Sequence, residues 1–164
     1  MKIRPETPQD YQKIHDLTAA AFAPMGFSDG TEAALVGQLR DKGALTLSLV
    51  VEEDGALIGH VAFSPVNIDG ATGDWFGLGP ISVRADRQRQ GVGRAMVEAG
   101  LQILSDREAA GCALTGNPNT YSRMGFVSDG NLHHKGTKDK YVQWRSLDGS
   151  KPAGWLVFDT AFGA

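Results

Sequence analysis

A glycine-containing helix start in the middle of the chain restricts most strongly what this sequence can fold into. The apolar segment 78–83 runs into an arginine-containing loop and then into Gln90-Gly91-Val92-Gly93, where an amphipathic helical pattern begins. The first N–H groups of a helix have no partner within the helix, and the aligned peptide dipoles add about half a positive charge there. Because Gly91 and Gly93 lack a Cβ atom, an anion can approach the backbone closely. The pattern predicts a site for a diphosphate.

The spacing of these glycines argues against two common nucleotide-binding patterns. A dinucleotide fingerprint needs Gly or Ala three residues after the second glycine, and Met96 stands there. It also needs an acidic residue about 20 residues further on, a region that Thr115-Gly116 occupies. No Gly-Lys-Ser or Gly-Lys-Thr stands at the spacing of a P-loop. Two alternatives stay open: glycines used only for tight helix packing, and a nicotinamide-dependent enzyme.

Hydrophobic periodicity predicts one domain, residues 1–164, of mixed α and β structure. Apolar residues at helical spacing predict helices at about 8–22, 31–42, 91–107 and 119–124, and Gly111 is expected to close the third. Runs rich in β-branched residues predict strands at about 2–4, 45–52, 56–63, 75–83, 112–115, 141–147 and 155–158.

Charge and cysteine content exclude several classes of protein. The net charge of −3 leaves no basic footprint for a nucleic acid. No stretch reaches the roughly 18 apolar residues of a membrane span. The single cysteine, Cys112, is expected in the core, and His133-His134 in a solvated loop without zinc spacing. We therefore expect a cytoplasmic domain with no nucleic acid, membrane or metal partner, and the sequence leaves monomer and homodimer open.

Three motifs stand in order along the chain. Gln88-Arg89-Gln90-Gly91-Val92-Gly93 is similar to the Q/R-x-x-G-x-G/A signature of the GCN5-related N-acetyltransferase (GNAT) superfamily. Leu78-Gly79-Pro80-Ile81-Ser82-Val83 resembles the strand that precedes this signature in the YhbS-like branch, and residues 116–126 resemble that branch's Gly-Asp-Pro…Tyr-x-Arg-Phe-Gly-Phe segment. Asn117 stands where that branch usually has aspartate, which removes a negative charge near the expected thiol end of the cofactor.

The resemblance implies an α/β (α+β) GNAT fold, in which a single mixed, mostly antiparallel sheet has splayed central strands and is flanked by helices. Acetyl-CoA would lie between the splayed strands, its pantetheine amides paired with the backbone of Ile81 and Val83. Its pyrophosphate would rest on N–H groups from Arg89 to Arg94. The expected cofactor-binding residues are Ile81, Ser82, Val83, Gln88, Arg89, Gln90, Gly91, Val92, Gly93, Arg94, Asn117 and Tyr121.

The implied reaction is transfer of the acetyl group to a primary amine by direct attack, through a tetrahedral intermediate. Tyr121 is the expected acid or hydrogen-bond donor for the departing thiolate. A backbone N–H near Ile81 or Ser82 is the expected hydrogen-bond donor to the oxyanion. Asp74 is a candidate general base, and water is the alternative. An aspartate after a glycine is also typical of a turn cap. A catalytically silent acyl-CoA-binding module is the alternative function.

The acceptor site is indicated only weakly. Asp29 and Glu32, at the expected start of the second helix, are candidate acceptor-binding residues. Acidic residues also favour helix starts for electrostatic reasons alone.

Overall fold

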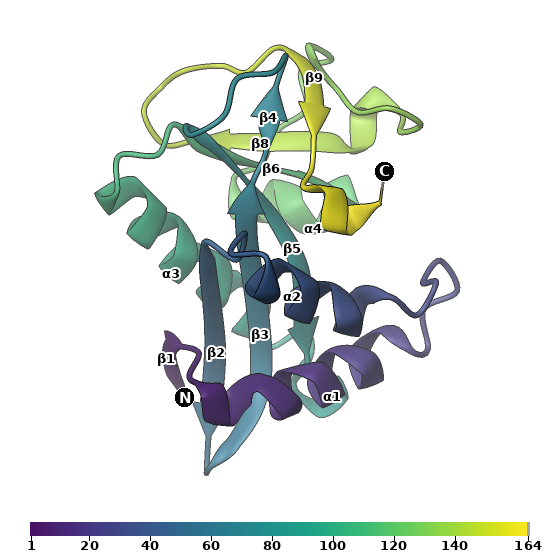
Figure 1. Ribbon diagram of the computed structural model, residues 1–164, viewed down its shortest axis with the longest axis vertical. Coiled ribbons are helices and arrows are strands. Elements are labelled where there is room, and N and C mark those ends of the chain that lie inside the picture. The colour runs from purple at the N-terminus through teal and green to yellow at the C-terminus, as the bar shows by residue number, and fades with distance from the viewer. Residues whose placement is uncertain (164) are drawn as a thin grey trace.

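A six-stranded sheet runs through the centre of the computed structural model, which describes residues 1–163 (Figure 1). Its strands, in spatial order, are β1 (Lys2–Pro5), β2 (Leu47–Glu53), β3 (Ala56–Pro65), β5 (Trp75–Val83), β6 (Gly111–Thr115) and β8 (Val142–Ser146). Neighbouring strands are antiparallel except β5 and β6, which are parallel. The predicted mixed, mostly antiparallel sheet is confirmed.

Helices cover both faces of this sheet (Figure 1). The α-helices are α1 (Tyr11–Phe22), α2 (Glu32–Asp41), α3 (Val92–Asp106) and α4 (Pro118–Tyr121). Short 3₁₀ turns occupy Pro8–Asp10, Ala85–Arg87, Ser122–Met124, Asp139–Tyr141 and Thr160–Phe162. Within residues 1–163, none of the helices combines the length and the apolar character needed to cross a membrane.

The side chains of β2 alternate between two core clusters, one on the face covered by α1 and α2 and the other on the face covered by α3. Leu49 and Val51 pack in a core cluster with α3 residues such as Met96, whereas Val50 packs with Ile14 and Val36 of α1 and α2. Successive side chains of a strand point to opposite faces, so these two clusters lie on opposite sides of the sheet. Burial on both faces explains why β2 reads as a continuous apolar run rather than an alternating one.

The C-terminal strand belongs to a second, small sheet that the sequence does not predict. This sheet has the order β4 (Asn67–Ile68), β9 (Gly154–Val157) and β7 (Leu132–His133). Two of its strands have only two residues, too few for a periodic pattern, and its pairings join distant parts of the chain. The Asp69 carboxylate holds β9 in place by accepting a 2.9 Å hydrogen bond from the N–H of Trp155.

The third predicted helix ends earlier than expected. α3 stops at Asp106, and Glu108 adopts a left-handed conformation with φ of 65°. Gly111 is therefore not the helix stop but the first residue of β6. A Cβ atom at Gly111 would collide with the indole ring of Trp75, so close strand packing explains this glycine.

Acid is expected to destabilise the chain through Asp10, which is 2% exposed. Both carboxylate oxygens accept hydrogen bonds from Arg4, at 2.7 and 3.0 Å, and these bonds hold the pKa of Asp10 at about 2, below its ordinary 3.8. As the pH falls, Asp10 is therefore protonated in the unfolded chain before it is protonated in the folded chain. About 2 kcal/mol of stability, present above about pH 5, should be lost as the pH falls toward about 2.

Urea unfolding across this pH range measures that loss. Asp10→Asn should flatten the decline, whereas Asp16→Asn, which neutralises an exposed carboxylate, should leave it in place. An Asp10→Asn protein with the original pH dependence would contradict the assignment.

Candidate functional site

The central strands β5 and β6 part after a short stretch of pairing. They are hydrogen-bonded only where Trp75–Gly77 lies beside Gly111–Ala113. Beyond that point β5 continues beside β3, and β6 continues beside β8. An open side is thereby left along β5 from Leu78 to Val83.

Backbone groups of β5 face this open side. The N–H of Arg84 donates to the carbonyl of Ile58 on β3, at 2.9 Å. In an antiparallel ladder, alternate residues direct their N–H and C=O groups to the same neighbour, so Ser82 also faces β3. Ile81 and Val83 therefore direct theirs away from β3, to the open side. The Gln88 side chain donates to the Val83 carbonyl at 3.0 Å, which leaves that oxygen a second lone pair.

The start of α3 lies against the same part of β5. Gly91 caps the helix in a left-handed conformation with φ of 85°, and its carbonyl accepts the hydrogen bond from the N–H of Ala95. The three N–H groups before Ala95, in residues 92–94, precede this bond and have no helical acceptor. A Cβ atom at Gly93 would lie 3.8 Å from Val83 and 3.9 Å from Ile81, in ordinary contact.

Tight packing does not explain these two glycines. A Cβ atom at Gly91 would meet nothing within 4 Å, and the one at Gly93 would meet only ordinary contacts. Gly91 is needed for its positive φ, whereas Gly93 leaves the backbone bare beside the open side of β5. The geometry fits an anion at the helix start better than a packing role.

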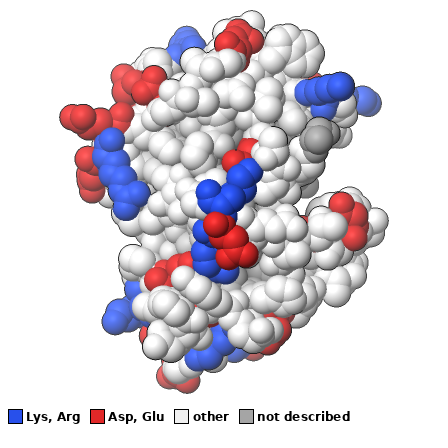
Figure 2. All heavy atoms as spheres, in the orientation of Figure 1, with Lys and Arg blue, Asp and Glu red and all other residues white. Residues whose placement is uncertain are grey.

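The arginines near this helix start differ in their partners. Arg87 pairs with Glu53 at 3.0 Å. None of the ion pairs within residues 1–163 involves Arg89 or Arg94, which are exposed. Arg89 also has a left-handed backbone, with φ of 63°, which turns the loop into the helix. On the face drawn in Figure 2, positive and negative side chains are interspersed and form no continuous basic surface.

Tyr121 lies at the end of α4, just after β6. Its ring packs edge-to-face on Phe126, with centroids 6.0 Å apart, and a Cβ atom at Gly116 would come within 2.7 Å of it. Burial raises the pKa of Tyr121, so the phenol keeps its proton at neutral pH. No hydrogen bond within residues 1–163 involves this hydroxyl, which leaves it available as a donor. Asn117 caps α4, accepting a 2.9 Å bond from the N–H of Asn119.

Comparison with known proteins places the chain in a family. A family model described as "Acetyltransferase (GNAT) family" matches residues 11–126. This chain belongs to the GNAT acetyltransferase family. The predicted family, fold and class of enzyme are thereby confirmed.

Individual GNAT proteins are similar to this chain over most of its length. The uncharacterized N-acetyltransferase YhbS of Escherichia coli (strain K12) is 40% identical over 127 residues, which cover 77% of this chain and 73% of that protein. A GNAT family acetyltransferase from Brucella melitensis, solved in complex with acetyl-CoA, is 42% identical with a TM-score of 0.88, covering 98% of this chain and 97% of that one. The structure of YhbS from Escherichia coli in complex with CoA gives 32% identity and a TM-score of 0.90, covering 99% and 92%.

Asp74 lies at the opposite end of β5 from the α3 start of this GNAT protein. It immediately precedes β5, where β5 and β6 still pair, and its carbonyl accepts a 2.7 Å hydrogen bond from the N–H of Ala110. Its exposed side chain stands outside the splayed region. This placement adds no support to Asp74 as the base.

The two acidic candidates for the acceptor site have local partners. Asp29 accepts hydrogen bonds from the N–H and hydroxyl of Thr31, at 3.0 and 2.5 Å, and these bonds lower its pKa. Glu32 accepts a 2.6 Å bond from Ser28. Both residues order the connection that leads into α2 of this GNAT protein, which accounts for their positions without an acceptor.

A row of buried polar side chains was missed by sequence reasoning. The Ser48 hydroxyl lies 2.6 Å from the carboxylate of Glu6 and 2.8 Å from Nε2 of His60. His60 is fully buried, and this burial lowers its pKa to about 4. A histidine inside the apolar run of β3 was the available signal.

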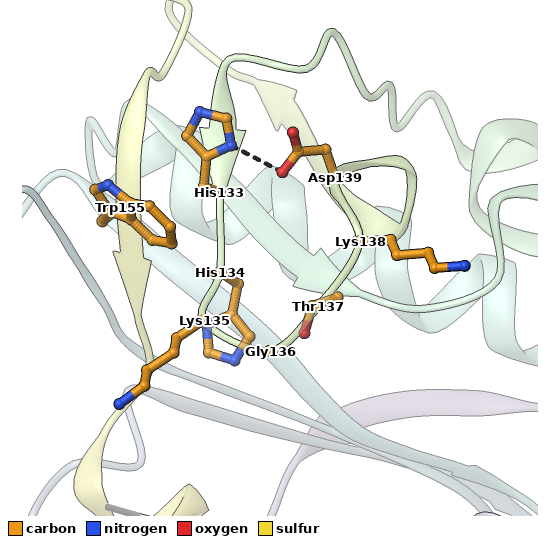
Figure 3. A pocket seen from close by; sticks show the side chains of 8 residues that line it. All are labelled: His133, His134, Lys135, Gly136, Thr137, Lys138, Asp139 and Trp155. Atoms are coloured by element: carbon orange, nitrogen blue, oxygen red, sulfur yellow. Dashed lines mark hydrogen bonds and ion pairs between the residues drawn. The ribbon is translucent and has the colours of Figure 1, made fainter.

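The histidine pair is not the solvated loop that the sequence predicts. His133 Nδ1 lies 2.8 Å from Asp139, and its ring faces Trp155 at 5.3 Å (Figure 3). His134 instead bonds the Leu156 carbonyl at 3.1 Å. These contacts line a shallow hollow of about 390 Å³ beside the small sheet. β9 orders this segment, a long-range contact that local composition does not indicate.

Proposed function

We propose that this GNAT protein is an acetyl-CoA-dependent N-acetyltransferase that transfers an acetyl group to a primary amine. The open side of β5 carries the proposal. There the backbone groups of Ile81 and Val83 lie within reach of the bare helix start at Gly93, so one extended ligand can meet both. The complexes of similar proteins with acetyl-CoA and CoA support the same ligand.

Each part of the cofactor has matching residues. The N–H groups from Arg89 to Arg94 suit the pyrophosphate, with the two arginines adding positive charge. The C=O group of Ile81 and the N–H and C=O groups of Val83 suit the pantetheine amides, as an added strand would. Asn117 and Tyr121, beyond the end of β6, suit the thiol end.

The chain's own residues can support direct transfer. As the amine nitrogen bonds to the acetyl carbon, the negative charge that develops on the acetyl oxygen needs a donor, and the N–H of Ile81 faces the open side where that oxygen would lie. The carbon–sulfur bond then breaks, and the Tyr121 hydroxyl, kept protonated by burial, donates to the thiolate. The nitrogen gives up its proton to water in the cleft, because Asp74 lies outside the splayed region.

Incubation with acetyl-CoA, a panel of primary amines and a thiol-detecting reagent tests this function. Thiol release that depends on one of the amines, together with a matching gain of one acetyl group on that amine, is the expected result. CoA binding without thiol release above background would favour the silent binding module. Thermal stabilisation by NAD but not by CoA would favour a nicotinamide-dependent enzyme.

A further inference from the structure

Four polar side chains cross the sheet in a row beneath α1 and α2. Glu6 follows β1, Ser48 lies on β2, His60 on β3 and Ser82 on β5, strands that are adjacent in Figure 1. Ser48, His60 and Ser82 are 6%, 0% and 2% exposed. Their neighbours along the strands, such as Val61, pack on the α3 face, so the row lies on the opposite face. The row runs from the edge of the sheet to the strand that lines the open side.

The hydrogen bonds of this row determine which nitrogen of His60 carries the proton. Burial alone would raise the pKa of Glu6, but hydrogen bonds from Arg40 and Ser48 outweigh it and lower this pKa, so Glu6 is an ionised acceptor. Ser48 has one hydroxyl hydrogen and donates it to Glu6. Its oxygen must therefore accept from Nε2–H of His60. Because neutral imidazole carries one N–H, Nδ1 is left as a lone-pair acceptor.

A matching donor lies on the neighbouring strand. His60 and Ser82 are direct cross-strand partners in the β3–β5 ladder, which places their Cβ atoms roughly 5 Å apart. His60 Nδ1 and Ser82 Oγ are both buried, and neither has a hydrogen-bond partner within residues 1–163. Buried polar atoms without partners are costly, and a hydroxyl hydrogen rotates freely. A hydrogen bond from the Ser82 hydroxyl to Nδ1 would satisfy both atoms and complete the row.

The position of Ser82 gives this contact a consequence for the ligand. Residues 78–83 of β5 have a hydrogen-bonded neighbour on one side only, and the β3–β5 register shifts by one between Val61 and Phe63. Ser82 stands between Ile81 and Val83, whose backbone groups face the open side. A side-chain anchor at Ser82 therefore holds a segment that the ladder supports on one side alone.

We propose that His60 is a positioning residue of the transfer reaction: oriented by Ser48 and Glu6, it holds Ser82 and so keeps the Ile81–Val83 backbone in place for the pantetheine. This inference rests on the proposed function, since it assigns the pantetheine arm to that backbone. It concerns the extended arm of the ligand and not the pyrophosphate, which lies at α3.

Calorimetric titrations with CoA and with its 3′-phosphorylated ADP half separate the two parts of the ligand. Ser82→Ala should weaken the binding of CoA about fivefold, the size of one hydrogen bond, and leave the affinity for the nucleotide half unchanged. Ser48→Ala frees His60 from its fixed tautomer and should have the same selective effect. The double variant should bind CoA as weakly as either single variant, because both act through His60.

Ser64→Ala is the matched control. Ser64 is on β3, fully buried and also without a partner for its hydroxyl, but it lies outside the row. Its removal should change neither affinity. Equal CoA affinity in wild type and Ser82→Ala, or an equal loss for both ligands, would overturn the positioning role. Failure of the wild type to bind CoA would instead overturn the proposed function first.

Discussion

Gly93→Glu is expected to abolish acetyl-CoA binding while the chain stays folded. The new Cβ atom would make only ordinary contacts with Val83 and Ile81, and a glutamate in the first turn of a helix stabilises the helix by about 0.3–1 kcal/mol. The same carboxylate would meet the pyrophosphate at the helix start. Two like charges in close contact cost several kcal/mol, so the affinity should fall about 100-fold or more.

Calorimetric titration with acetyl-CoA and thermal unfolding measure the two halves of this prediction. Gln102→Glu is the control, because it adds the same charge to an exposed position far along α3. It should bind acetyl-CoA as the wild type does. An unchanged affinity in Gly93→Glu would rule out the α3 start as the pyrophosphate site.

Tyr121→Phe is expected to lower kcat about 100-fold, the usual size of a lost general acid, with little change in the affinity for acetyl-CoA. Phenylalanine keeps the ring that packs on Phe126 and over Gly116, so only the hydroxyl is lost. That hydroxyl is the proposed donor to the thiolate, which forms only as the carbon–sulfur bond breaks. A loss confined to kcat is the signature of an interaction made in the transition state.

Steady-state kinetics with saturating amine measure this change. Tyr11→Phe serves as the control, because it removes the hydroxyl of an exposed tyrosine and keeps the ring, whose centroid lies 3.8 Å from the guanidinium carbon of Arg40. It should leave kcat unaltered. A Tyr121→Phe enzyme with wild-type kcat would show that water, and not this phenol, serves the thiolate.

The parts of the site that are local in the chain were predictable from the sequence. Unpaired N–H groups at a helix start depend only on where the helix begins, and Gly91 marks that place by its conformation. The family and the main helices were predicted for the same reason, since each depends on short-range patterns, whereas the mixed sheet was predicted from the resemblance to that family. The roles of Tyr121 and Asp74 stay predictions, because they depend on where a ligand lies.

The parts that depend on strand register were not predictable. In a regular strand, every second side chain points to the same face, so the sequence would put Leu78 and Ser82 of β5 on one face. In the structure Leu78 packs with Ile81 on the α3 side, while Ser82 faces His60, because the register shifts by one between these positions. A shift of one residue exchanges the two faces of a strand.

The sequence by itself determined that this chain is a GNAT protein and predicted an anion site at the start of α3, since contiguous residues carry both signals. The tertiary structure alone decided that β9 joins a second sheet, that α3 ends at Asp106, and that Glu6, Ser48, His60 and Ser82 form one row. These features arise from pairings between residues far apart in the chain. Which residues become partners depends on the register and twist of the whole sheet, and no local pattern carries that information.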